Sequence, residues 1–138
     1  MADYVKKVIT ENPKSISICF FIEQNIVMEM GKKIKKSVSN TFGKIITRLF
    51  PNVALMNGYD WEAFINYYLQ KNHPDVLPNM ETDPEAGMYV AFYSYSTENE
   101  KKADKLIDII IELMENESTL LEKIKTDGKL IKWNQDLK

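Results

Sequence analysis

The sequence predicts an α+β fold: a small antiparallel sheet built from hairpins, with three to four helices packed on it. Strand-like alternation of apolar residues occurs twice beside a turn signal, at residues 15–22 and 88–95. Apolar residues at helical spacing occur in three or four longer segments. A chain of 138 residues has the usual length of one domain, so we expect a single domain over residues 1–138.

The first hairpin is expected in YVKKVIT and SISICFFI, the segments before and after residues 11–14. The short connection contains Pro13, a residue common in turns. In the second segment β-branched and aromatic residues recur with period two, which is typical of a strand. These apolar positions are Ile16, Ile18, Phe20 and Ile22.

Residues 31–50 have the apolar spacing of a helix, but Ser37, Asn40 and Gly43 weaken it. We therefore expect one interrupted helix or two short ones, ending before Pro51. The apolar stripe consists of Ile34, Val38, Phe42, Ile45, Ile46, Leu49 and Phe50.

The next helix is expected to begin at NGYDWEAF. Asn57 and Gly58 are a turn signal, and Asp60 is predicted to cap the helix by accepting its free N–H groups. Pro74 prevents the helix from continuing much beyond Asn72. We interpret Trp61 as the apolar anchor of this helix, in a stripe with Phe64, Ile65 and Tyr68.

A second hairpin is predicted in NMETDPEAGMYVAFYSYS, with its turn at residues 83–87. Proline presets φ in such a turn, and glycine tolerates a positive φ. The strand after the turn alternates between two faces. One face carries Met88, Val90 and Phe92, and the other carries Tyr89, Ala91, Tyr93 and Tyr95.

Two helices are expected to follow. Thr97 and Glu100 have the spacing of a capping box, and the helix after them is strongly amphipathic. A shorter helix follows Asn116, and after Gly128 the segment KLIKW is either a short strand or an irregular tail. The inner stripes are Ala103, Leu106, Ile107, Ile110, Leu113 and Met114, then Leu120, Leu121 and Ile124.

No catalytic motif and no cofactor site is legible in the sequence, so we expect neither. His73 is interpreted as a residue that satisfies carbonyl groups at a helix C-terminus. One histidine and one cysteine, Cys19, cannot form a zinc site of the usual type or an internal disulfide. Glu81, Asp83 and Glu85 are better explained by turn chemistry than by a bound metal.

The charges are unevenly distributed, although the net charge is only −2. The segment from Lys32 to Arg48 is basic, whereas residues 72–100 carry acids and no lysine or arginine. The two regions can attract each other, or the basic one can bind a nucleic acid. We expect nucleic acid to be an unlikely partner because the whole chain is acidic and stacking aromatics are missing from this segment. We also expect no membrane span and a cytoplasmic location.

Tyrosines beside acidic residues suggest a surface that binds another protein, because tyrosine is enriched at protein interfaces and acids attract a basic partner. The tyrosines can alternatively pack beneath another element of a two-sided sheet. The candidate partner-binding residues are Tyr67, Glu81, Asp83, Glu85, Tyr89, Tyr93 and Tyr95.

Two motifs in this order, NGYDWE at residues 57–62 and DPEAGMY at 83–89, resemble the immunity protein family numbered fifty-one of bacterial polymorphic toxin systems. The similarity covers residues 57–116 well and the first hairpin more loosely. The basic segment departs from the family pattern. Gly58, Asp60, Trp61, Asp83 and Gly87 match that pattern, and we assign them to the scaffold.

The resemblance implies a non-enzymatic inhibitor that binds the C-terminal domain of a cognate toxin and occludes its active or functional surface. Two alternatives remain open. A ligand-binding or enzymatic domain would need a pocket lined by groups such as His73, Glu81 and Tyr89. A nucleic-acid module would use the Lys32 to Arg48 segment on one exposed face. The oligomeric state stays open.

Overall fold

The computed structural model describes residues 2–49 and 56–133, with the backbone alone for residues 39–49. It confirms the α+β class. The helices and strands, in chain order, are β1 (Val5–Thr10), β2 (Ser15–Phe21), α1 (Asn25–Leu49), α2 (Gly58–Asn72), β3 (Glu81–Thr82), β4 (Met88–Ser94), α3 (Thr97–Glu115) and α4 (Glu117–Asp127). Short 3-10 helices η1 (Pro74–Val76) and η2 (Gly128–Leu130) complete the order.

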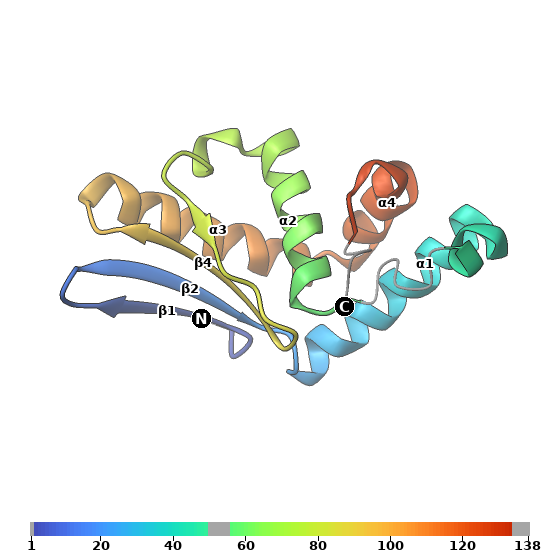
Figure 1. Cartoon of the computed structure of the whole chain (residues 1–138), viewed down its shortest axis with the longest axis horizontal. Coiled ribbons are helices and arrows are strands. Elements are labelled where there is room, and N and C mark those ends of the chain that lie inside the picture. Colours follow the sequence, from blue (N-terminus) through green and yellow to red (C-terminus); the bar gives the residue numbers. More distant parts are fainter. Residues whose placement is uncertain (1, 50–55, 134–138) are drawn as a thin grey trace.

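The four strands form one antiparallel sheet in the order β1-β2-β4-β3, so both predicted hairpins are confirmed and lie side by side (Figure 1). β2 pairs with β4 over its whole length, with Cys19 opposite Val90. Paired residues project to the same side of a sheet. The core side of β2, which carries Ile18 and Phe20, therefore continues into Ala91 and Tyr89 of β4.

Helices α2 and α3 lie on one side of the sheet (Figure 1). The apolar stripe predicted for α3 is confirmed, because its members are all buried. Lys7 also links β1 to α3 by two ion pairs. Its Nζ lies 3.2 Å from a carboxylate oxygen of Glu100 and 2.8 Å from one of Asp104. α4 packs between α3 and α1, and the predicted Leu120 and Ile124 are buried there.

Helix α1 differs from the predicted helix in where it begins and in being continuous. It begins six residues earlier, at Asn25, and runs unbroken to Leu49. Val27, Met30, Ile34 and Val38 are all buried, so packing of this stripe outweighs the weak intrinsic propensity of the polar residues. The helix is described as far as Leu49. Its predicted end before Pro51 and the predicted apolar side chains from Phe42 onward lie outside the described residues.

Two helices are capped by other residues than the sequence predicts. Asn57, not Asp60, caps α2, and its side chain accepts from the Asp60 N–H at 3.0 Å. Ser96, not Thr97, caps α3, and its hydroxyl accepts from the Asn99 N–H at 2.9 Å. Asp60 is instead fully buried within the first turn, where its carboxylate accepts the Met56 N–H at 2.9 Å.

The prediction that Trp61 anchors α2 is confirmed. The indole is 1% exposed and meets Phe20 of β2 edge to face, with ring centroids 5.1 Å apart. The described tail after Gly128 forms no strand: it completes η2 at Leu130 and is irregular from Ile131 to Trp133. It returns to the core, where Ile131 and Trp133 are buried and the Trp133 indole donates to the Gly128 carbonyl.

The first turn of α2 lies directly against the turn between β3 and β4. The Gly58 N–H donates to the Ala86 carbonyl at 2.9 Å. A Cβ on Gly58 would lie 1.7 Å from the Glu85 carbonyl oxygen and 2.5 Å from that of Met88. Gly87 does not lie in the left-handed φ region, contrary to expectation. The two short motifs thus meet in space at one backbone junction, hereafter the Gly58 junction.

Replacing Gly58 by alanine is expected to destabilise the protein by about 3 kcal/mol or more, because the new methyl group overlaps backbone that cannot move away cheaply. Urea unfolding followed by circular dichroism measures this. Gly31→Ala is the control, since its Cβ would lie 3.1 Å from the Met56 Cβ and helix propensity favours alanine by about 1 kcal/mol. Equal effects of the two substitutions would contradict the importance of the junction.

Candidate functional site

The candidate site is the side of the sheet opposite α2 and α3, hereafter the open face. Within the described residues, no helix covers it (Figure 1). Side chains alternate across a strand, so the residues between the buried positions of β2 and β4 point to this face. All of these alternate residues are at least partly exposed.

The middle of the open face is apolar. A sheet face that meets water normally carries polar side chains in alternation with the buried ones. Here Cys19 lies opposite Val90, and Phe21 lies opposite Met88. A group of neighbouring apolar side chains that stay partly exposed is a candidate interaction site. The partly exposed apolar set is Val8, Cys19, Phe21, Met88, Val90 and Phe92.

The margin of the open face at β3 is acidic. Glu81 lies opposite Phe92, and Asp83 donates its N–H to the Val90 carbonyl at 2.9 Å. Glu81, Asp83 and Glu85 are exposed and form no ion pair with any described residue. These three predicted partner-binding residues therefore lie together beside the apolar patch. That they contact a partner stays a prediction.

Tyr89 and Tyr93 do not reach the surface. They are 0% and 1% exposed, because their side of β4 faces α2 and α3. The Tyr93 hydroxyl donates to the Val76 carbonyl at 2.8 Å, whereas burial raises the pKa of Tyr89 and keeps its hydroxyl neutral. A side chain without exposed area cannot contact a partner in this conformation. For these two residues the packing interpretation holds, and the partner-binding interpretation is wrong.

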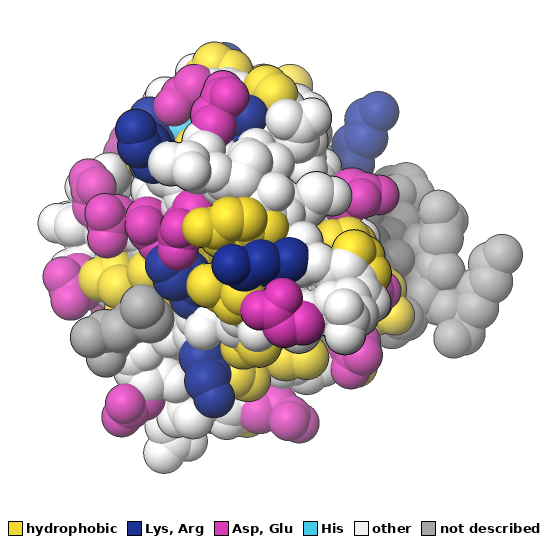
Figure 2. All heavy atoms as spheres, turned by 90° about the vertical axis from the view of Figure 1, so that its left-hand side faces the viewer, with side chains coloured by type: hydrophobic (Ala, Val, Ile, Leu, Met, Phe, Trp, Pro, Cys, Tyr) yellow, Lys and Arg dark blue, Asp and Glu magenta, His cyan; other side chains and the backbone are white. Residues whose placement is uncertain are grey.

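Tyr95 and Tyr67 remain accessible but lie apart from the acidic margin. Tyr95 is 37% exposed, and the Lys14 ammonium sits 4.0 Å from the centre of its ring. Figure 2 shows the end of the molecule where the β1–β2 turn meets the start of α3, with hydrophobic and basic side chains in the middle and acidic side chains mostly around them. Tyr67 is partly exposed on α2, on the helical side of the molecule.

The described lysines of the basic segment lie on α1 and are solvated. Lys33 pairs with Glu117 of α4 at 2.6 Å, and Lys32 pairs with Glu29 at 3.2 Å. Neither pairs with the acidic residues between 72 and 100, so the proposed attraction between the two regions is not seen in the described part of the chain. The side chains of Lys44 and Arg48 lie outside it.

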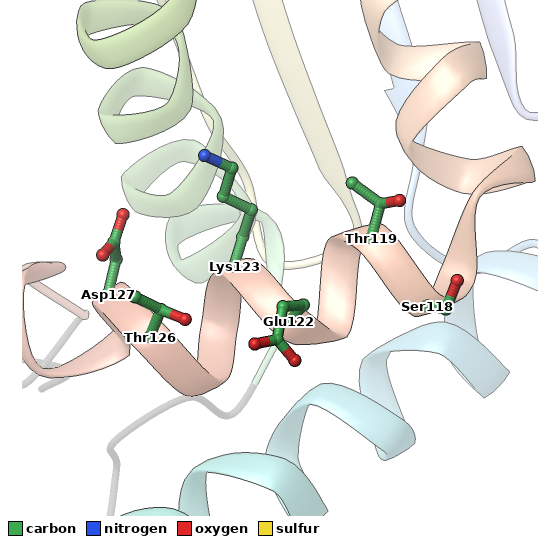
Figure 3. Close-up of a pocket in the computed structure, with 6 residues that line it drawn as sticks. All are labelled: Ser118, Thr119, Glu122, Lys123, Thr126 and Asp127. Carbon is green, nitrogen blue, oxygen red and sulfur yellow. The ribbon is translucent and has the colours of Figure 1, made fainter.

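The ligand-pocket alternative gains no support from His73. Its backbone N–H donates to the Leu69 carbonyl as a helix cap, and its ring lies near that of Tyr68. An open hollow of about 520 Å³ runs along α4 instead (Figure 3), lined by Ser118, Thr119, Glu122, Lys123, Thr126 and Asp127. These side chains leave one helix in different directions. Among the described residues, no group of three or more potential metal-binding side chains occurs.

Sequence reasoning identified the two faces of β4 but left open which face the helices cover, and it placed its candidate tyrosines on the face that is buried. Both faces are apolar, so alternation alone cannot show which one the helices cover. Ala91 was one signal that the helices cover the tyrosine face, because a small residue between two tyrosines lets a helix come close to the strand. The serines of β2, Ser15 and Ser17, also pointed to an outward face that includes Cys19.

Comparison with known proteins gives one match. The model of the family Immunity protein 51 matches residues 8–129. No curated protein and no solved structure matches the chain. In the described part of the chain, no helix is both long and apolar enough to cross a membrane.

The two buried tyrosines are expected to respond differently to the loss of their hydroxyl groups. Tyr93→Phe should cost about 1 to 2 kcal/mol, because it leaves the buried Val76 carbonyl without its donor. Tyr89→Phe should be neutral or stabilising, since the Tyr89 hydroxyl has no partner among the described residues. Urea unfolding of both variants measures the difference, and the reverse order would contradict the assigned contacts.

Cys19 is expected to react slowly with iodoacetamide in the native protein. Partial burial raises the pKa of its thiol, and this outweighs the lowering by nearby Lys6. Only the thiolate reacts. The alkylation rate, measured from about pH 7 to 10, should therefore reach its midpoint at a higher pH in the folded than in the urea-unfolded chain. A lower midpoint in the folded protein would contradict the assigned environment.

Proposed function

The chain belongs to the Immunity protein 51 family, and from this membership we propose that it is an antitoxin-like immunity protein. It binds a cognate bacterial toxin domain and neutralises it by occluding an active or functional surface of that domain. It acts as a cytoplasmic inhibitor and is not an enzyme.

The observation that supports this function most directly is the open face. An apolar patch with an acidic margin gives a protein partner both a desolvated centre and a polar rim, which is the usual anatomy of a protein interface. A specific complex buries about 800 Å² on each partner. We place the β3–β4 turn and the acidic margin in the proposed contact together with the apolar patch.

The charge of the margin suggests the chemistry of the partner. Glu81, Asp83 and Glu85 carry negative charge that no described lysine neutralises. Such a margin speeds the encounter with a basic surface. Toxins that act on nucleic acids present basic surfaces to phosphate groups, and carboxylates at the margin can occupy the same positions. We therefore propose that the toxin domain is basic where it meets the open face.

Neither of the two alternative functions, a nucleic-acid module or an enzymatic or ligand-binding domain, is favoured by a comparable observation. A nucleic-acid module would use α1, but two of its described lysines already pair with Glu29 and Glu117. An enzyme would need a nucleophile or base held by a partner group. The side chains along α4 form no hydrogen bond or ion pair with one another in the described residues.

Co-expression with the toxin domain encoded beside this protein tests the proposed function. We expect growth to be rescued and a complex to co-purify. Val90→Lys should abolish rescue and weaken binding by about 30-fold or more, because it places a charge at the centre of the patch. Val90 is partly exposed, so the variant should keep its fold.

The matched control is Met28→Lys on α1, where the side chain is 45% exposed and the helix packs mainly on α4. It should rescue growth fully. Glu81→Lys reverses one charge of the acidic margin. It should lower the rate of association with the toxin domain and weaken the dependence of that rate on salt. Failure of the wild-type protein both to rescue growth and to bind would reject the function. Rescue by Val90→Lys with unchanged affinity would reject the open face.

A further inference from the structure

Strand β1 forms one edge of the sheet. It comes first in the strand order β1-β2-β4-β3, so among the described residues it pairs with a strand on one side only (Figure 1). The strand at the other edge, β3, has two residues, whereas β1 has six and pairs with β2 without a bulge. A free edge presents a row of unpaired backbone groups to which another strand can bond. Of the two edges, the one at β1 is the longer template for such a strand.

The hydrogen bonds between β1 and β2 show which backbone groups of β1 face outward. The Phe21 N–H donates to the Tyr4 carbonyl at 2.8 Å, so these two residues form a hydrogen-bonded pair. In an antiparallel ladder such pairs alternate with pairs whose N–H and C=O groups point away from each other. Counting from Tyr4, every second residue bonds to β2, and the residues between them face the free edge. The outward-facing residues are Val5, Lys7 and Ile9.

The backbone groups of Lys7 and Ile9 are free for a further strand. The Val5 N–H donates to the Ala2 carbonyl at 3.3 Å, which removes one donor from the edge. For Lys7 and Ile9, by contrast, no described residue bonds to the N–H or the C=O group. A strand that pairs with this edge must therefore place an N–H and a C=O opposite each of these two residues.

The side chains at the edge allow a second strand to approach. Lysine on an edge strand usually opposes pairing because it brings a charge beside the incoming strand. Here the ammonium group of Lys7 is directed to α3, where it pairs with Glu100 at 3.2 Å and with Asp104 at 2.8 Å. Ile9 lies on the same side of the strand and is 42% exposed. A neighbouring strand would cover this apolar side chain.

A second copy of β1 offers the groups that this edge needs. When two copies run antiparallel about a two-fold axis at Val8, Lys7 of each copy lies opposite Ile9 of the other. These residues then form hydrogen-bonded pairs on both sides of the axis, so that all of their outward N–H and C=O groups have partners. On the other side of the sheet, the exposed Lys6 lies opposite the neutral Thr10, and no like charges face each other.

The neighbouring registers fit less well. An axis at Lys7 would set two lysines opposite each other, and it would pair Ile9 with Val5, whose N–H is already used. An axis at Ile9 would pair Lys7 with Glu11, which lies beyond the end of β1. The axis at Val8 avoids both faults, so the edge is complementary to itself in one register.

The contact is small for a dimer interface. A standard interface uses about 20 to 30 residues on each side, whereas β1 has six. We therefore expect a weak dimer with a Kd of roughly 10 to 100 µM.

We propose that β1 is a homodimer interface, in which two copies of the chain pair antiparallel through their free edges about a two-fold axis at Val8. The two sheets then form one continuous sheet. Val8 belongs to the apolar set of the open face, so the open faces of the two copies join at the axis. The dimer forms without a toxin, and the proposal does not rest on the proposed function.

Analytical ultracentrifugation of the full chain, from about 5 to 500 µM, measures the dimer on both sides of its expected Kd. Ile9→Lys should weaken the dimer about tenfold or more, because it places an ammonium group opposite Lys7 of the second copy. The exposure of Ile9 should let this variant keep its fold. Ile26→Lys on α1, where the side chain is 54% exposed, is the matched control and should dimerise as wild type. Val90→Lys, on β4, should also dimerise as wild type.

Disulfide cross-linking tests the register in a Cys19→Ser background. Two residues on the axis have Cα atoms about 4.5 Å apart, within the range of about 4.4 to 6.8 Å that a disulfide spans. Val8→Cys should therefore form a covalent dimer on mild oxidation. Thr10→Cys, on the same side of β1, is the matched control. Its two copies would lie roughly 13 Å or more apart and should cross-link far more slowly.

Four results would overturn the proposal. The first is a wild-type chain that stays monomeric over the whole concentration range, as expected if the edge pairs only with a strand of another protein. The second is dimerisation of Ile9→Lys with the Kd of the Ile26→Lys control. The third is loss of the dimer in Val90→Lys, which would place the contact on the open face. The fourth is equal cross-linking of Val8→Cys and Thr10→Cys.

Discussion

The close backbone contact at the Gly58 junction determines how the two layers of the molecule meet. Because Gly58 has no Cβ, the first turn of α2 reaches the Glu85 and Met88 carbonyls and donates to Ala86. This contact directs Trp61 onto Phe20 of the central strand. It also holds α2 on one side of the sheet, which leaves the opposite side of β2 and β4 without a helix in the described residues.

The position of the acidic residues follows from the same junction. The turn that carries Glu85 is fixed on one side by Gly58 and on the other by the Ile22 N–H, which donates to Gly87. Glu81 and Asp83 extend from this turn beside the apolar patch. A rigid turn presents its charges without a large loss of conformational entropy on binding. The first motif, residues 57–62, thus supports the scaffold of the proposed interface, whereas the second motif, residues 83–89, supplies Asp83, Glu85 and Met88 to the interface itself.

Most elements of the fold could be predicted, because local patterns determine them. Period two marks β2 and β4, and the stripe from Ala103 to Met114 marks α3. The first six residues of α1 were missed, although Val27 and Met30 continue the helical spacing of Ile34 and Val38 and are buried with them. Each cap was placed off by one to three residues because Asn57 and Ser96 stand beside other good capping residues. The choice between the two faces of β4 depends on tertiary packing that no single segment encodes.

A methionine-methyl NMR spectrum of the complex tests most directly the claim that the open face binds the toxin. The chain contains seven methionines, and Met88 lies on the open face whereas Met28 is exposed on α1. On addition of the unlabelled toxin domain, the Met88 methyl signal should shift or broaden and that of Met28 should stay in place. A change at Met28 with an unaltered Met88 signal would contradict the account.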